Sequence, residues 1–159
     1  MPSRRPPTHP ATANYGVTDL LKFLAGRWHL ARTIAGPGGA PLGVAHGTAE
    51  WRDAGCGAGA SAYDERGILV QHGAELPFTQ SYTYTRSGAE PHRAAVAFRD
   101  GRFFHALDLS AGACAVRHEC APDLYEGTVT AVSPAALRFE WRVTGPFKSY
   151  TIRTDLTRE

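Results

Sequence analysis

The 159-residue sequence lacks several features that would assign it to a large functional class. It has no apolar run near the roughly 18 residues that a membrane-spanning helix needs. It also lacks an excess of one charge, because 17 Lys and Arg residues balance 15 Asp and Glu residues to a net charge of +2. The basic residues are scattered along the chain. We therefore expect a soluble protein with neither a nucleic-acid nor a membrane partner.

Cysteine is scarce, and familiar catalytic motifs are missing. Cys56, Cys114 and Cys120 are odd in number and without paired spacing, so we expect reduced thiols rather than a disulfide framework or a structural zinc site. No P-loop, no Gly-x-Gly-x-x-Gly after a strand and no Gly-x-Ser-x-Gly elbow occurs. Nucleotide-dependent chemistry and serine hydrolysis therefore have no support in the sequence.

The length suits one domain, which would bury about 70% of the surface that the unfolded chain exposes. Residues 1–14, MPSRRPPTHPATAN, begin with basic residues as a signal peptide does, but Pro, Thr and His follow where an apolar segment is needed. We expect residues 1–14 to be a disordered tail and residues 15–159 to be one domain of a cytoplasmic protein. The sequence does not indicate an oligomeric state.

One segment has the pattern of a helix, and the rest has the pattern of strands. Leu20, Leu21, Phe23 and Leu24 form an apolar stripe, which predicts a helix over 17–25 with Thr18 as N-cap and Gly26 as its end. After it, apolar and polar residues alternate, as in Leu137 to Thr144. This alternation predicts strands near 27–35, 44–52, 60–70, 78–85, 92–99, 102–109, 113–120, 123–132, 137–144 and 147–157.

Short turn signals separate these strands, such as Asp100-Gly101, Ser133-Pro134 and Gly145-Pro146. About ten strands with short connections describe an up-and-down antiparallel meander. Closing the meander into a barrel removes exposed edges, and a barrel of more than eight strands has room for a ligand. A β-sandwich is the structural alternative, but the single helix directly before a Gly-Arg-Trp strand favours the barrel. The predicted fold class is all-β.

Four segments carry a resemblance to a known family: FLAGRWHLART, FRDGRFFH, RHECAPDLYEG and WRVTGPFKSY. Together they resemble a bacterial family of lipocalin-like domains of unknown function, over roughly Leu20 to Arg158. Gly26-Arg27-Trp28 is similar to the Gly-x-Trp signature of lipocalins and other calycin barrels, which implies that Trp28 packs across the closed end. The resemblance implies a lipocalin-like barrel and no activity. Barrels of this shape include carriers of apolar ligands, haem-binding proteins, and cofactor-free cyclases and isomerases.

The predicted inward faces carry more polar residues than a plain core tolerates. Alternation places Phe103, His105, Leu107 and Leu109 together inside the barrel. The interior residues that we expect to bind ligand are Arg32, Glu65, Tyr82, Tyr84, His105, Cys120, Asp123 and Trp141.

Each of these positions also has a structural interpretation. Arg32 and Glu65 suit an ion pair at the barrel end, His105 suits a loop cap, and Asp123 suits a turn. Cys120 suits a small buried hydrophobe. The aromatic residues suit the core, although some of them at the cavity mouth would fit a planar ligand.

His118, Tyr125, Lys148 and Tyr150 form the candidate catalytic group, because two adjacent strands and the last strand place reactive side chains on one predicted face. The leading hypothesis is a cofactor-free isomerase, cyclase or lyase acting on a largely apolar small molecule. His118 would be the general base, Tyr125 or Tyr150 the acid, and Lys148 the stabilising charge.

The main alternative is a non-catalytic carrier or sensor, in which the same groups hold the polar end of a ligand. A haem-binding or metal-binding barrel with His118 or His105 as ligand is the third hypothesis, because His118 and Cys120 share one strand face. We otherwise expect no metal and no cofactor.

Overall fold

The computed structural model describes residues 14–55 and 59–159. Residues 1–13, nearly all of the predicted tail, and Cys56 lie outside the described residues. The described chain has one short helix, a 3-10 turn and ten strands, which confirms the all-β prediction. Their bounds are α1 (Leu20–Leu24), β1 (Gly26–Ala35), η1 (Pro37–Gly39), β2 (Pro41–Asp53), β3 (Ala60–Gln71), β4 (Ala74–Arg86), β5 (Arg93–Phe98), β6 (Phe103–Asp108), β7 (Ala113–Cys120), β8 (Asp123–Ser133), β9 (Ala136–Thr144) and β10 (Ser149–Arg158).

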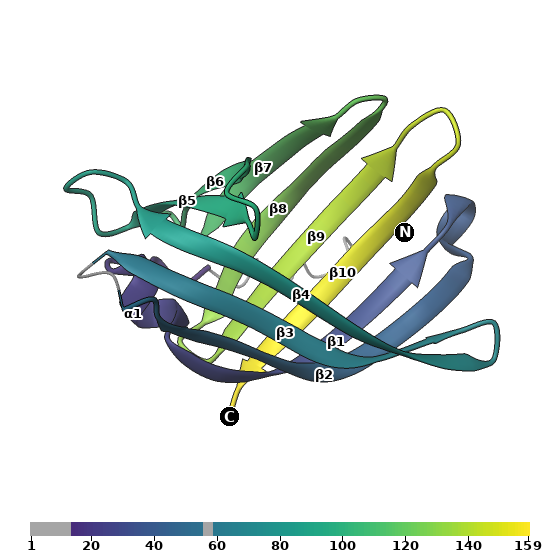
Figure 1. Cartoon of the computed structure of the whole chain (residues 1–159), viewed down its shortest axis with the longest axis horizontal. Coiled ribbons are helices and arrows are strands. Elements are labelled where there is room, and N and C mark those ends of the chain that lie inside the picture. Colours follow the sequence, from purple (N-terminus) through teal and green to yellow (C-terminus); the bar gives the residue numbers. More distant parts are fainter. Residues whose placement is uncertain (1–13, 56–58) are drawn as a thin grey trace, which may run out of the picture.

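The ten strands form one antiparallel sheet in the order β6-β5-β4-β3-β2-β1-β10-β9-β8-β7. The first and last strands of the chain, β1 and β10, pair in the middle of this order, with Trp28 opposite Arg158. The sheet curls so that its two edges, β6 and β7, lie side by side (Figure 1). The result is a nearly closed barrel, as the alternation predicted, and of the lipocalin-like kind that the family resemblance implied. None of the helices in the described part of the chain has the length and apolar character to cross a membrane.

Helix α1 plugs one end of the barrel, where Leu20, Leu24 and Trp28 are completely buried. The Trp28 indole N–H donates to the Leu24 carbonyl at 2.9 Å, so the predicted packing of this tryptophan across the closed end is confirmed. Around it the core contains the large buried residues Trp51, Leu107, Leu109, Leu137 and Leu156.

The predicted start of the helix was wrong. The helix begins at Leu20 rather than Val17, and its N-cap is Asp19 rather than Thr18. The Val17 N–H donates to the Leu109 carbonyl at 2.9 Å, and this tertiary bond holds the chain away from the helical path. The Asp19 carboxylate instead accepts from the Lys22 N–H at 3.2 Å.

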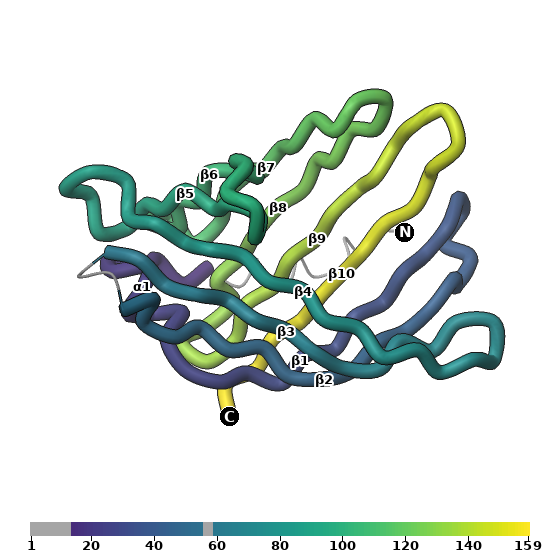
Figure 2. The backbone as a smooth tube through the Cα atoms, viewed as in Figure 1, coloured from purple at the N-terminus to yellow at the C-terminus, as the bar shows by residue number. Residues whose placement is uncertain are grey.

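At the other end the hairpin tips spread apart, and the backbone trace shows β3–β4 diverging from β7–β8 and β9–β10 (Figure 2). Gly47 and Gly67 lie opposite each other in β2 and β3. A Cβ at Gly47 would lie 2.0 Å from the Arg66 carbonyl oxygen, so only glycine allows this close approach of the two strands. Helix α1 therefore covers one end of the barrel, and the diverging hairpin tips lie at the other end.

A register shift in the β5–β6 ladder changes which side chains face inward. Val96 pairs with His105 but Ala97 pairs with Phe103, so Phe104 is an extra residue in the ladder. Strict alternation predicted Phe103 inside, and that prediction was wrong, because Phe103 is 60% exposed. Phe104 takes its place in the interior, next to His105.

Candidate ligand-binding pocket

A cavity of about 190 Å³ lies inside the barrel. Seven strands contribute to its wall, so it is a feature of the whole sheet rather than of one loop. The lining residues are Arg32, Tyr63, Glu65, Gln80, Tyr82, Tyr84, Phe104, His105, Tyr125, Phe139, Trp141, Ile152 and Thr154. For scale, an engineered apolar cavity of about 150 Å³ binds benzene. The cavity can therefore hold a molecule of one or two fused rings.

An ion pair forms the main polar part of the wall. Arg32 on β1 donates to both carboxylate oxygens of Glu65 on β3, at 2.8 and 3.0 Å, and its Nε donates to the Thr154 hydroxyl at 2.8 Å. The Tyr63 hydroxyl donates to Glu65 Oε2 at 2.5 Å. Burial opposes the charge of Arg32, but the hydrogen bonds and negative charge of Glu65 outweigh it, so the pKa of Arg32 is raised.

The sequence left two roles for Arg32 and Glu65, a structural ion pair and ligand binding, and their positions in the structure are compatible with both. Glu65 is 5% exposed, so the pair is a buried structural contact, as one alternative proposed. Both residues also line the cavity, as a ligand-binding role requires. Because the two charges cancel, the wall has hydrogen-bonding capacity without a net charge.

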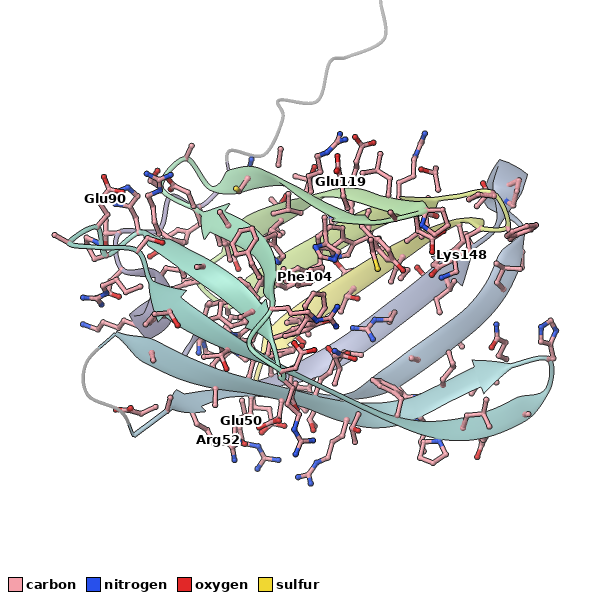
Figure 3. All side chains as sticks on the ribbon, turned by 45° about the horizontal axis from the view of Figure 1, so that its top comes forward. Glu50, Arg52, Glu90, Phe104, Glu119 and Lys148 are labelled. Atoms are coloured by element: carbon pink, nitrogen blue, oxygen red, sulfur yellow. The ribbon has the colours of Figure 1, made fainter. Side chains whose placement is uncertain are left out.

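Aromatic rings make a nearly parallel series across the cavity wall. Tyr63 and Tyr82 have centroids 5.8 Å apart and planes inclined by 17°. Tyr82 and Phe104 follow at 5.2 Å and 16°, and Phe104 and Trp141 at 5.4 Å and 20°. Figure 3 shows Phe104 in the middle of the barrel interior. These four stacked rings therefore give the cavity a continuous aromatic wall, which suits a largely apolar ligand.

The tyrosines of this wall are held in their neutral form. Burial raises the pKa of Tyr82 to about 12, with the Glu65 charge as the next cause. Burial also raises the pKa of Tyr63 and Tyr84 well above the ordinary value, and the charge of Glu65 contributes to both. Their hydroxyls are therefore hydrogen-bonding groups at neutral pH rather than bases.

These shifts predict a loss of stability at high pH. An unfolded tyrosine ionises near pH 10, and Tyr82 ionises near 12 in the fold, so the folded chain holds the proton more tightly. The stabilisation is therefore complete below about pH 10 and is lost as the pH rises through about 12. Tyrosinate absorbance followed together with circular dichroism should show the buried tyrosines ionising only as the sheet unfolds. Full ionisation near pH 10 with the sheet intact would contradict the prediction.

Two predicted histidines lie near the seam between β6 and β7. His105 is 2% exposed and lines the cavity, with Nδ1 3.0 Å from the Ala106 carbonyl oxygen. It is therefore an interior residue rather than the loop cap that was its structural interpretation. His118 does not line the cavity, and its Nδ1 lies 3.0 Å from the Phe104 carbonyl oxygen. The His118 bond joins β7 to β6, between which no strand ladder forms in the described residues.

The strand register brings most of the candidate catalytic group into one row. His118 pairs with Tyr125, and Tyr125 and Tyr150 both pair with Val143. The rings of His118 and Tyr125 are 6.2 Å apart. Burial and then the neighbouring Tyr125 raise the pKa of Tyr150. Of this row, Tyr125 lines the cavity, whereas His118 and Tyr150 lie outside its lining.

Lys148 and Asp123 lie at the hairpin end of the barrel and form an ion pair. Lys148 Nζ is 2.9 Å from Asp123 Oδ2, and this hydrogen bond raises the pKa of Lys148. Figure 3 shows Lys148 beside the hairpin tips, away from Phe104. Cys120, which pairs with Asp123 in the register, is exposed, so its interpretation as a buried hydrophobe was wrong. None of these three residues lines the cavity.

The remaining predicted ligand-binding residues, Tyr82, Tyr84 and Trp141, all line the cavity. Lining residues that were not proposed as site residues are Tyr63, Gln80, Phe104, Phe139, Ile152 and Thr154. All of these except Phe104 share the alternating face of a proposed residue on the same strand, so the signal was present in the sequence. Across residues 14–55 and 59–159, no group of three or more His, Cys, Asp or Glu side chains is placed to hold a metal ion.

Comparison with known proteins agrees with this architecture. A family model described as a family of unknown function, DUF6314, matches residues 24–158. No curated protein matches the chain. An S-type phycobiliprotein lyase, CPES from Guillardia theta, has 10% sequence identity and a TM-score of 0.65, with 88% of this chain and 90% of that chain covered.

Two further solved structures are similar. A DUF3598 protein of unknown function from Nostoc punctiforme has 12% identity and a TM-score of 0.63, covering 92% of this chain and 51% of that one. A de novo designed fluorescence-activating β-barrel has 12% identity and a TM-score of 0.49, covering 90% of this chain and 100% of the design. At these identities the similarity concerns the fold alone.

Proposed function

The chain belongs to DUF6314, a family of unknown function, and we propose that it binds a flat, largely apolar small molecule inside its barrel. The observation that carries this proposal is the cavity of about 190 Å³, which combines nearly parallel aromatic rings with a paired Arg32–Glu65 contact. Ligand sites are typically apolar clefts with a few placed polar groups. This cavity has that composition.

The closed end of the barrel limits where a ligand would enter. Leu20, Leu24 and Trp28 are completely buried at the α1 end. We therefore expect a ligand to enter from the opposite end, where the hairpin tips lie (Figure 2). The fold shared with a phycobiliprotein lyase is compatible with this proposal, which depends on the cavity of this chain rather than on that protein's activity.

A titration with 2-methylnaphthalene tests the proposal, because this probe is flat, neutral and without hydrogen-bonding groups. We expect saturable one-to-one binding, followed by quenching of tryptophan fluorescence, since Trp141 lines the cavity. Ile152→Trp should fill part of the cavity and raise the Kd of the probe at least about tenfold. A tenfold change in Kd corresponds to about 1.4 kcal/mol of binding free energy. Thr151→Trp is the matched control, because Thr151 is the exposed neighbour on the same strand.

Two results would reject this function. One is the absence of saturable binding by the parent protein. The other is equal binding by the parent and Ile152→Trp, which would place the probe outside the barrel.

Catalysis by a cofactor-free isomerase, cyclase or lyase is the second candidate. It is favoured by the row of His118, Tyr125 and Tyr150, in which Tyr125 lines the cavity. A carbonyl oxygen only accepts, so His118 donates through Nδ1 to Phe104 and keeps a lone pair on Nε2 as a base requires. A structure of the complex with 2-methylnaphthalene separates the candidates. Contact of the probe with Tyr125 and His118 supports chemistry, and a probe confined to the Tyr82–Trp141 wall supports a carrier or sensor.

A further inference from the structure

His105 offers an unused hydrogen-bond acceptor to the cavity. Its ring packs edge-on against Phe104 at 4.7 Å and Trp141 at 5.5 Å, both of which line the cavity. Its Nδ1 lies 3.0 Å from the Ala106 carbonyl oxygen. A carbonyl oxygen can only accept, so Nδ1 carries the hydrogen of the neutral ring and Nε2 carries the lone pair.

Among residues 14–55 and 59–159, the lone pair on Nε2 has no protein partner. In the described part of the chain, no hydrogen bond involves Nε2 of His105, although the side chain is 2% exposed. Burial lowers the pKa of His105, so the ring is neutral at pH 7. Among the described residues, the completely buried side-chain atoms without a partner are Trp51 Nε1 and Arg86 Nε. Nε2 of His105 is not one of them, so it is accessible from the cavity that His105 lines. A donor on a bound molecule would complete its hydrogen bonding.

The charged groups of the wall are already paired with each other. Arg32 uses Nε, Nη1 and Nη2 toward Thr154 and Glu65, and Glu65 also accepts from Tyr63. The charges of Arg32 and Glu65 cancel, and the nearby Tyr82 is neutral because its pKa is about 12. A carboxylate entering the cavity would meet no unpaired cation and would approach the Glu65 charge.

Resting on the proposed function, we propose that the cavity selects neutral flat molecules that carry a hydroxyl or a ring N–H, which donates to Nε2 of His105. The class includes phenols, indoles and pyrroles. Molecules of the same shape without a donor bind less tightly, and those with a carboxylate bind least tightly.

Three probes of one shape test this selectivity at pH 7: 2-naphthol, 2-methylnaphthalene and 2-naphthoate. The hydroxyl of 2-naphthol is replaced by a methyl group of similar size in the second probe and by a carboxylate in the third. We expect 2-naphthol to bind about tenfold more tightly than 2-methylnaphthalene, as one buried hydrogen bond allows. 2-Naphthoate should bind most weakly.

Variants of His105 test whether this residue causes the difference in affinity between 2-naphthol and 2-methylnaphthalene. His105→Phe keeps a flat ring without an acceptor, so the ratio between 2-naphthol and 2-methylnaphthalene should fall to about one. His105→Gln keeps an acceptor and should restore part of the ratio. His29→Phe is the control, because His29 lies on the exterior with 65% of its side chain exposed.

If these variants do not fold, NMR of the unmodified protein tests the same hydrogen bond. The ¹⁵N resonance of His105 Nε2 should shift when 2-naphthol binds and should not shift in this way with 2-methylnaphthalene. Equal affinity of these two probes would overturn the selectivity while leaving the proposed binding function intact. Tightest binding of 2-naphthoate would also overturn it, and binding by none of the probes would reject the binding function as well.

Discussion

Replacing Arg32 with methionine is expected to lower the free energy of unfolding by about 3–5 kcal/mol, the usual cost of removing one partner of a buried ion pair. The variant leaves Glu65, which is 5% exposed, without its bidentate partner. It also removes the donor to Thr154. Urea unfolding followed by circular dichroism measures the change.

A double variant shows whether the uncompensated charge is the cause. Arg32→Met combined with Glu65→Leu replaces both ions by apolar groups and should recover much of the stability, because neither charge is then buried alone. Arg117→Met is the matched control, since Arg117 pairs with Glu126 on the exposed outer face. Its effect should be much smaller. A double variant as unstable as Arg32→Met alone would contradict this explanation.

Replacing Trp28 with alanine should destabilise the protein by about 3–5 kcal/mol, as truncation of a fully buried tryptophan does. Trp28 has no exposed surface and packs edge-on against Phe23 and Trp51, at 5.9 and 6.1 Å. The Arg158 guanidinium lies over its ring at 4.1 Å. The variant therefore leaves a cavity where α1, β1 and β10 meet. Urea unfolding of the parent and the variant gives the difference.

Two further variants separate the parts of this effect. Trp28→Phe keeps a ring but loses the donor to the Leu24 carbonyl, so it should cost less than the alanine variant. Phe147→Ala is the control, because Phe147 is 97% exposed and its loss should change stability by no more than about 0.5 kcal/mol. If Trp28→Ala were no more harmful than Phe147→Ala, the plug at the α1 end would not contribute to stability.

Alternation in the sequence was sufficient to predict the strands and most of the pocket. Arg32, Glu65 and Tyr82 were identified because alternation places these polar side chains on inward faces, and in the structure all three line the cavity. Each of these strands keeps its register over the relevant stretch, so the period of two assigns the face correctly.

Prediction failed where tertiary contacts interrupt the local pattern. The extra residue Phe104 shifts the β6 register, and nothing in Phe103-Phe104-His105 indicates which phenylalanine faces outward. Thr18 is a residue type that often caps helices, but the hydrogen bond from the Val17 N–H to the Leu109 carbonyl holds the chain outside the helix there, so Asp19 is the N-cap and the helix begins at Leu20. The position of His118 outside the cavity lining follows from its bond to the Phe104 carbonyl, which depends on how β6 and β7 meet.

The pairing of β1 with β10 in the middle of the sheet determines the order in which the barrel can assemble. All the remaining ladders of the described sheet join strands that are consecutive in the chain. The meanders β1–β6 and β7–β10 can therefore form through local loop closures. The contact of Trp28 with Arg158 instead joins residues from distant parts of the sequence. Long-range closures carry the larger entropic cost and slow folding. We therefore expect the β1–β10 ladder, at the centre of the folded sheet, to form late in folding.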